Sequence, residues 1–466
     1  MASQNVVLVC IDTVRRDTFE AVADRLGTRA DTRFTNAWAA STWSVPSHAS
    51  MFTGDLPSEH GNFSRSIRFD ELPDYGTFLN RMEMESTWGV SANGYANSSF
   101  GFDDLFDEFV DVYDGVRYPS AIDLRKFVRQ SDREGVSLYL SFLRAAVTSS
   151  SPVGSLTNGV GALTSQILEN SRLPVPTPFD GGAKAVLSSV EELEFREPFF
   201  GFVNVMDAHS PLTDALHFDS DLYSVPRGWT SANVDFVDEG PQAVPAAVDN
   251  YRSLYQAAVD YVDRIVDRVI DVLDEQTDRE TTVVLTADHG DNLGYASEWH
   301  QWGHVYCNRF TDSLLNVPMA IVNAPEGYDD IEQELFSHLD LGRLLVALSR
   351  GETPHLWREL SPFETMGVGT IQSSDLNESD IESKLAEWDV QMRGVVTEEG
   401  ELIQWQQGGE AVTGDGSDYR TGLPESHDRS VLESAFEDDF PSVSGDGRDD
   451  IDQATQERLE RLGYRE

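Results

Sequence analysis

Short apolar runs are the clearest feature in the pattern of hydrophobic and polar positions along the chain. Residues 5–12, 198–205 and 282–287 are mostly apolar, which predicts strands buried within a sheet. Residues 248–276 instead place apolar side chains every three or four positions, which predicts one long helix leading into the last of these strands. A helix that connects two strands is typical of a β-α-β unit. The pattern therefore predicts an α/β fold with a central, mostly parallel sheet flanked by helices.

Shorter elements complete this arrangement. The pattern predicts further strands over 34–40, 88–93 and 317–322, and helices over 16–26, 72–84, 182–193 and 339–348. Residues 111–180 have a looser pattern, with helical stretches over 122–130 and 138–147 interrupted by the Ser/Gly/Pro-rich stretch 148–178. We expect segment 111–180 to be an insertion that shapes the mouth of a pocket, or a mobile lid.

The composition changes beyond about Pro362. A hairpin is predicted over 392–405, around Glu399-Gly400, followed by an acidic linker and a final helix over 452–462. We therefore expect a catalytic domain over residues 1–362 and a small C-terminal α+β lobe over residues 363–466.

Two of the predicted buried strands end in side chains that bind metals. Asp12 ends the first strand, and Asp288-His289 follows the strand that begins at Thr282. Open α/β sheets build their sites at the carboxyl ends of parallel strands, so these side chains are expected to meet. Two carboxylates and an imidazole suit a divalent ion, either Mg, Mn, Ca or Zn, as one ion or two.

A hydroxyl group precedes a predicted short helix in the stretch 39–54. Ser44 lies just before Pro46, a residue that is favoured in the first turn of a helix. The free N–H groups of such a turn attract an anion, so Ser44 is well placed to attack a phosphate or sulfate ester. Ser44 could equally be a helix N-cap without a catalytic role. Ser47 and His48 lie too close along the turn to be identified as its base.

In this order, Asp12, Ser44 and Asp288-His289 resemble the sulfatase branch of the alkaline phosphatase superfamily. The resemblance covers nearly the whole chain, through segments that include Asn93-Gly-Tyr95, Gly101-Phe-Asp-Asp104, Asp207-Ala-His209, Gly303-His304 and Leu462-Gly-Tyr464. It implies an alkaline-phosphatase-like sandwich and an ester hydrolase. It also implies that Asp12, Ser44, Asp288 and His289 bind metal.

The resemblance suggests roles for four further residues. Asp207 and His209 are expected to bind a second ion or to contact the ester. His304 is expected to protonate the leaving oxygen or to bind the second ion, with His300 as a weaker substitute. Asn93 is expected to donate an amide hydrogen bond to a nonbridging oxygen of the ester. His60 and His338 are expected to be structural.

One departure from the family pattern concerns the nucleophile. Sulfatases carry formylglycine there, and the enzymes that make it read a following proline and arginine, whereas Ser44-Val-Pro-Ser-His48 lacks the arginine. We therefore expect Ser44 to remain a serine, which can form a covalent phosphoserine, and to cleave a phosphate or sulfate ester, with phosphate preferred. The alternatives are an ordinary sulfatase, a transferase that moves a phospho-substituent onto a glycan, and a non-catalytic binding protein on this fold.

The charge balance restricts the partners. The chain has 81 Asp and Glu residues and 34 Lys and Arg residues, a formal net charge of −47, and the acidic residues are dispersed. This composition is typical of a salt-adapted protein from a high-salt cytoplasm, because at molar salt the Debye length is ~3 Å. Nucleic acids and anionic membranes are therefore not expected as partners. A small-molecule or glycan ester is the expected substrate, and the oligomeric state stays open.

The two cysteines and the lengths of the apolar runs indicate where in the cell the protein is expected. Cys10 lies inside the first predicted strand and Cys307 shows no metal-type spacing, so both are expected to be structural and no disulfide framework is predicted. No apolar run approaches the ~20 residues of a membrane-spanning helix. The first strand begins by Asn5, which leaves no room for a signal peptide, so a cytoplasmic protein is expected.

Overall fold

The structure is a computed structural model of the chain. It describes residues 4–63, 66–112, 116–129, 131, 133, 135–171, 174–234, 236, 240–304, 309–366, 391–406, 411–414, 419–421 and 433–436. The predicted final helix over 452–462, the Leu462-Gly-Tyr464 segment and Cys307 lie outside the described residues.

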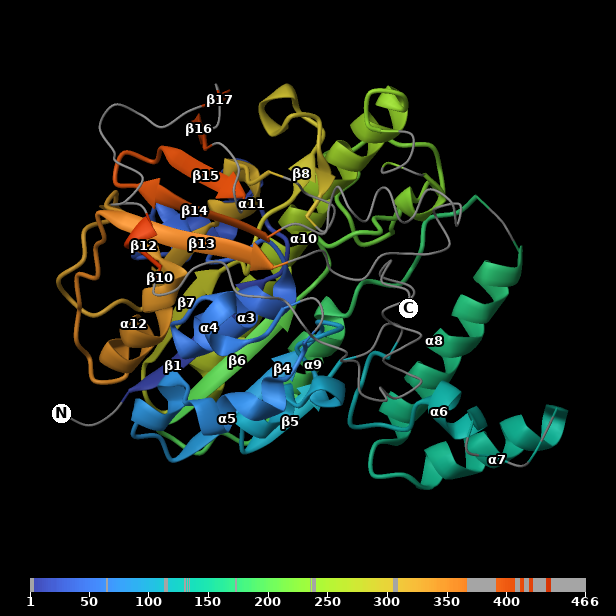
Figure 1. The fold of residues 1–466 in the computed structure, drawn as a ribbon. Helices are drawn as coiled ribbons and strands as arrows, with labels where there is room; N and C mark the ends of the chain where they lie inside the picture. Colours follow the sequence, from blue (N-terminus) through green and yellow to red (C-terminus); the bar gives the residue numbers. More distant parts are fainter. Residues whose placement is uncertain are drawn as a thin grey trace.

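An eight-stranded sheet forms the centre of the fold (Figure 1). Its strands, in spatial order, are β11 (Ile331–Glu332), β2 (Thr32–Phe34), β10 (Met319–Val322), β7 (Thr281–Thr286), β1 (Asn5–Ile11), β6 (Phe199–Val205), β4 (Ser86–Ser91) and β5 (Glu108–Asp111). The five strands from β7 to β5 are parallel. The predicted mostly parallel sheet is thus confirmed, but β10 runs antiparallel to both of its neighbours.

Helices cover both faces of this sheet, because side chains alternate along its central strand. Val7, Val9 and Ile11 of β1 pack in the same core as α10 (Pro245–Gln276) and α9 (Ala183–Glu192). Val6 and Leu8 pack on the opposite face with α3 (Ser44–Thr53) and α12 (Leu341–Leu348). The short helices α1 (Arg16–Val22) and α2 (Asp24–Arg29) lie beside α10.

Three predicted elements are divided in the structure. The helix predicted over 16–26 consists of α1 and the start of α2. The strand predicted over 34–40 is split: β3 (Ala37–Trp38) leaves the main sheet and pairs with β12 (Phe336–Ser337). The helix predicted over 72–84 consists of α5 (Leu72–Tyr75) and a 3₁₀ turn, η2 (Phe78–Arg81). Gly76 separates them with a φ of 105°, a value that ends a right-handed helix.

Segment 111–180 contains more helix than its composition predicts. The structure has α6 (Leu124–Arg129), α7 (Gly135–Thr148) and α8 (Pro152–Ser171), so the expectation that residues 148–178 interrupt the helices is wrong. The small residues of α8 serve packing, since a Cβ on Gly159 would lie 2.5 Å from the ring of Phe142 on α7. We call residues 116–171 the helical excursion. It lies to one side of the sheet (Figure 1).

A five-stranded antiparallel sheet follows the main sheet. It consists of β13 (Leu360–Met366), β14 (Gln391–Thr397), β15 (Leu402–Gln406), β16 (Val412–Gly414) and β17 (Tyr419–Thr421). The predicted hairpin over 392–405 is confirmed as β14–β15. The ring of Phe363 lies 4.6 Å from that of Phe310, so this sheet packs on the main core. The division into two domains at residue 362 stays a prediction.

The remaining elements are short. They are α4 (Pro57–His60), α11 (Asp312–Leu315), β8 (Asn292–Leu293), β9 (Trp302–Gly303), and the 3₁₀ turns Phe69–Glu71, Ser98–Phe100, Phe102–Leu105, Ser231–Asn233, Ala296–Glu298 and His338–Asp340. None of the helices in the described part of the chain is long and apolar enough to cross a membrane.

Candidate active site

Two buried carboxylates and an imidazole converge at the carboxyl ends of the central strands. Cys10 pairs with Thr286, so Asp12 and Asp288 each lie two residues beyond paired positions of β1 and β7. Both carboxylates and the His289 ring are completely buried. Ligand atoms of the three residues lie within 4.8 Å of one another. The structure thus brings Asp12, Asp288 and His289 together, as the sequence predicted.

Ser44 joins this cluster as the first residue of α3. Trp43 is the N-cap and makes no side-chain capping bond, so Ser44 does not cap the helix. Its Oγ lies 3.4 Å from Oδ2 of Asp12 and 3.5 Å from Nε2 of His289. The N-terminus of α3 therefore presents the hydroxyl to the carboxylate and imidazole atoms.

Backbone and side-chain donors fix the two carboxylates. Asn93 donates to Oδ2 of Asp12 at 2.5 Å, and Thr13 Oγ1 donates to Oδ1 of Asp12 at 2.6 Å. The Thr13 N–H donates to Oδ1 of Asp288 at 3.2 Å, from a backbone with φ of 62°. Asn93 is therefore in the site, with its amide directed at Asp12. Thr13 was not singled out from the sequence, where its position after Asp12 was the only signal.

The charge at this cluster is negative. Burial raises the pKa of a carboxyl group, but the imidazoles of His289 and His48 outweigh burial at Asp288, and its pKa lies below the ordinary value. Among the described residues, Oδ2 of Asp288 has no hydrogen-bond partner. Because an ionised buried carboxylate needs a positive partner, the cluster fits a divalent cation held by Asp12, Asp288 and His289.

Three histidines share one arrangement around the cluster. In each, Nδ1–H donates to an oxygen: His289 to the Gly290 carbonyl at 2.8 Å, His209 to the Ser210 carbonyl at 2.5 Å, and His304 to Oδ1 of Asp291 at 3.1 Å. Nε2 is then the unprotonated nitrogen of each neutral ring, as in metal-binding histidines. The centre of the His304 ring lies 4.5 Å from that of His289 and 5.1 Å from that of His209.

The environment of His304 favours its neutral form. Burial and the adjacent imidazoles of His289 and His209 lower the pKa of His304 well below its ordinary value. Burial also raises the pKa of its partner Asp291 to about 6. A neutral ring can accept a proton or bind a second ion. Asp291 was missed in the sequence, although it lies only two residues after His289.

Asp207 lies apart from the cluster. Its two carboxylate oxygens accept hydrogen bonds from the N–H groups of Gly181, at 2.9 Å, and Ala183, at 3.0 Å, at the start of α9. A carboxylate in this position stabilises a helix N-terminus. His300, the weaker alternative to His304, is exposed and donates from Nδ1 to the Gly294 carbonyl. His60 and His338 are buried and bonded to Ser50 and Thr286, in keeping with structural roles.

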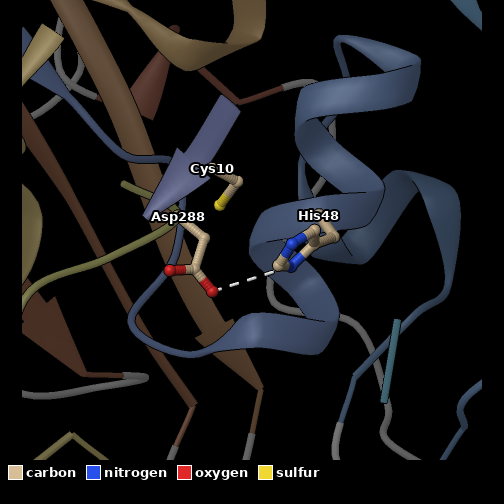
Figure 2. A group of neighbouring side chains, drawn as sticks. All are labelled: Cys10, His48 and Asp288. Carbon is tan, nitrogen blue, oxygen red and sulfur yellow. Dashed lines mark ion pairs between the residues drawn. The ribbon is translucent and has the colours of Figure 1, made fainter. Parts of the chain in front are cut away.

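His48, which the sequence left unassigned, connects the first turn of α3 to the Asp288 carboxylate. Its Nδ1 lies 2.7 Å from the Ser44 carbonyl oxygen and 3.6 Å from Oδ2 of Asp288. Figure 2 shows the Asp288 carboxylate directed at the His48 ring, with Cys10 of β1 beside them. Nδ1 carries a proton that it donates to the carbonyl, and Asn204 donates to Nε2 at 3.3 Å. Both ring nitrogens are thus engaged in hydrogen bonds within the protein. The ligand atoms of His48, Cys10 and Asp288 also lie within 4.8 Å of one another.

The sequence matches a known protein family. A sequence model of the family described as Sulfatase matches residues 4–349. The chain belongs to the Sulfatase family. No curated protein sequence gave a match.

Solved structures agree with this sulfatase fold. A 2-O GAG sulfatase superposes with a TM-score of 0.53 at 14% identity, covering 89% of this chain and 85% of that one. A putative sulfatase from Bacteroides thetaiotaomicron gives 0.51 at 14% identity, covering 89% and 87%. Phosphonate monoester hydrolase of Agrobacterium radiobacter gives 0.50 at 16% identity, covering 88% and 89%. The predicted fold is confirmed, and the protein is an ester hydrolase of the sulfatase family.

Proposed function

We propose that this sulfatase-family protein cleaves a phosphate or sulfate ester with metal assistance, through Ser44 as the nucleophile and with phosphate esters preferred. One observation carries the proposal: Ser44 Oγ lies 3.4 Å from Asp12 and 3.5 Å from Nε2 of His289, at the N-terminus of α3. A serine in this position is adjacent to ion ligands and to the N–H groups that stabilise an anion.

Asp12, Asp288 and His289 would hold a divalent ion, Mg, Mn, Ca or Zn. When bound, such an ion lowers the pKa of an adjacent hydroxyl group and neutralises negative charge on the ester oxygens. Thr13 and Asn93 keep the Asp12 carboxylate in one orientation through their hydrogen bonds of 2.6 and 2.5 Å. The Gly290 carbonyl does the same for His289.

Cleavage of a phosphate ester then proceeds in two steps. Ser44 Oγ loses its proton and attacks phosphorus, the bond to the leaving oxygen breaks, and the alcohol departs with one proton. Water then attacks the phosphoserine, which releases inorganic phosphate and restores the Ser44 hydroxyl. N–H groups at the start of α3 stabilise the developing oxygen charge in both steps.

His304 and His209 supply the second part of the proposal. His304 is neutral and its Nδ1 is held by Asp291, so Nε2 can accept a proton from the nucleophile and pass it to the leaving oxygen. The Nε2 atoms of His304 and His209 are also suited to bind a second ion.

Ser44 is proposed to remain serine. The position of the arginine that formylglycine formation requires is taken by His48, which holds the Ser44 carbonyl at 2.7 Å. An unmodified hydroxyl can attack phosphorus directly and form a phosphoserine. A formylglycine at position 44 would instead support sulfate esters as the main substrates.

An ester panel tests the proposal. Purified protein in molar KCl is assayed with an aryl sulfate, a phosphate monoester, a phosphodiester and a phosphonate monoester, each with Mg, Mn, Ca and Zn, and with an acceptor alcohol to detect transfer. We expect phosphoester turnover that Ser44→Ala abolishes. Ser47→Ala is the matched control, because Ser47 is in the same turn but its Oγ donates to the Ser41 carbonyl.

Two results would contradict the proposal. Turnover that survives Ser44→Ala would exclude Ser44 as the nucleophile. Turnover confined to the aryl sulfate, together with formylglycine at position 44 in peptide mass spectrometry, would favour an ordinary sulfatase.

A further inference from the structure

Helix α7 of the helical excursion is apolar on two sides. Its inner side contributes Phe142 and Ala146 to the small core of the excursion, and Leu138 is also buried. Its outer side exposes Tyr139, Leu140, Leu143 and Val147 to solvent. At 100° per residue these four positions fall within an arc of about 100° on one face of the helix. An exposed apolar stripe of this kind is unusual on a monomeric protein.

Helix α8 repeats the pattern. It buries Ala162 against α7 but exposes Val153, Val160 and Leu163. The outer stripes of α7 and α8 are therefore not needed for the core that holds the excursion together. Eight of the fourteen exposed large hydrophobic residues in the described part of the chain lie between Val128 and Leu163.

Helix α7 and most of α8 lack acidic residues. Residues 135–168 contain one charged side chain, Arg144, and no Asp or Glu, whereas the whole chain has 81 acidic residues in 466. Over the whole helical excursion, residues 116–171, there are six Lys and Arg residues and four Asp and Glu residues. In a chain of net charge −47, the helical excursion is therefore a surface where a second molecule of the same kind meets little electrostatic repulsion.

We propose that the outer stripes of α7 and α8 form a symmetric interface with a second copy of this chain. A two-fold axis brings the same apolar surface of both copies together, so the stripes of one copy pack against the same stripes of the other. The excursion also lies to one side of the sheet, which keeps the two acidic bodies apart (Figure 1). This inference is independent of the chemistry at Ser44.

An anionic bilayer fits the surface less well. Helices that lie in a membrane interface are rich in lysine and arginine on the polar face, but α7 and α8 together carry only Arg144 over residues 135–168. The body, with its excess of acidic residues, would also be repelled by anionic lipid headgroups.

Sedimentation velocity over a concentration series in molar KCl tests the interface. We expect the wild-type protein to be a dimer, and Leu140→Glu to weaken the dimer by at least ~tenfold, as for a central interface residue. Leu216→Glu is the matched control: Leu216 is 68% exposed and Leu140 is 61% exposed, but Leu216 lies outside the helical excursion. The control should dimerise like the wild type.

Four results would overturn the inference. One is a wild-type protein that stays monomeric throughout the series. Another is equal weakening by Leu140→Glu and Leu216→Glu, which would indicate a general charge effect. The third is a monomer that binds anionic vesicles through Leu140, which would assign the stripe to a bilayer. A fall in melting temperature for Leu140→Glu without any change in mass would likewise mean that the stripe is covered within one chain.

Discussion

Ser44 and His48 lie one helical turn apart in α3, and each lies near a different part of the cluster formed by Asp12, Asp288 and His289. Ser44 faces Asp12 and His289, whereas His48 holds the Ser44 carbonyl and approaches Asp288. Both interactions depend on strands that are distant in sequence. The position of the hydroxyl is thus set from two sides, as a nucleophile requires.

The positioning role of His48 leads to a prediction. His48→Ala removes the donor to the Ser44 carbonyl, and we expect kcat to fall ~10²-fold, since small displacements of a reacting group have effects of that size. Metal content should not change, because both ring nitrogens already have partners within the protein. His48→Gln, which can still donate, should restore part of the rate. An unchanged kcat in the alanine variant would show that His48 has no part in positioning.

Asp288 and Asp207 are both carboxylates implied by the family resemblance, and the structure separates them. Asp288→Asn should lose the bound divalent ion, measured by elemental analysis. Asp207→Asn should keep that ion but lower the free energy of unfolding by ~1 kcal/mol, because it loses charged hydrogen bonds at the start of α9. Full metal content in Asp288→Asn would contradict the proposed ligand set.

At the scale of elements, the loop after β7 is held against the backbone of α11. Gly290 donates to the Leu314 carbonyl at 2.8 Å, and a Cβ on Gly290 would lie 1.9 Å from the Ser313 carbonyl oxygen. A neighbouring backbone atom cannot rotate away as a flexible side chain can. The loop that carries Asp288 and His289 therefore requires glycine at this position.

We accordingly expect Gly290→Ala to be damaging. Thermal denaturation should show a loss of ~1–3 kcal/mol, as for other overpacked sites, together with weaker metal binding. Gly27→Ala is the control, because no atom lies within 4 Å of its added Cβ and it lies inside α2. That change should stabilise the protein by ~0.5–1 kcal/mol. Equal effects of the two substitutions would refute the steric argument.

The sequence predicted those elements whose pattern depends on burial alone. β1, β6, β7 and α10 were found because each is buried along one face or both. β10 is just as buried, but its direction depends on the connection before it, which an apolar run does not encode. α8 was missed because Gly154 and Gly159 resemble loop residues, whereas they allow close contact with Ala121 and Phe142.

The same distinction holds within the site. Asp12, Asp288, His289 and Ser44 were predictable because they follow strands or precede a helix that bring them to one edge of the sheet. Thr13 and His48 make hydrogen bonds to those residues, and Asp291 accepts one from His304. No apolar pattern in the sequence marks such hydrogen-bond partners. Asp207 matched the family pattern, but its orientation toward α9 depends on the loop before that helix.

At the scale of the whole molecule, acidic residues outnumber their possible partners. Arg29 alone lies near three carboxylates of α10, at 3.0 Å from Asp267 and 3.5 Å from Asp274, with Asp271 also bonded. With 34 basic residues for 81 acidic ones, most carboxylates repel one another unless salt screens them.

The fold is therefore expected to depend on salt. Melting temperature measured from molar KCl down to a few millimolar buffer should fall by at least ~10 °C, which corresponds to a loss of several kcal/mol in a chain of this size. Sucrose at matched osmolality is the control, because it leaves the charges unscreened. A melting temperature that does not change with KCl would contradict the salt-adapted interpretation.

The state of Ser44 during turnover tests the central proposal most directly. Protein mixed with a phosphate monoester and a divalent ion is quenched with acid within the first turnovers, and its peptides are analysed by mass spectrometry. We predict phosphoserine at Ser44, and an unmodified serine at that position in the resting protein. Turnover with the phosphoryl group on another residue, or formylglycine at position 44 in the resting protein, would contradict the proposed mechanism.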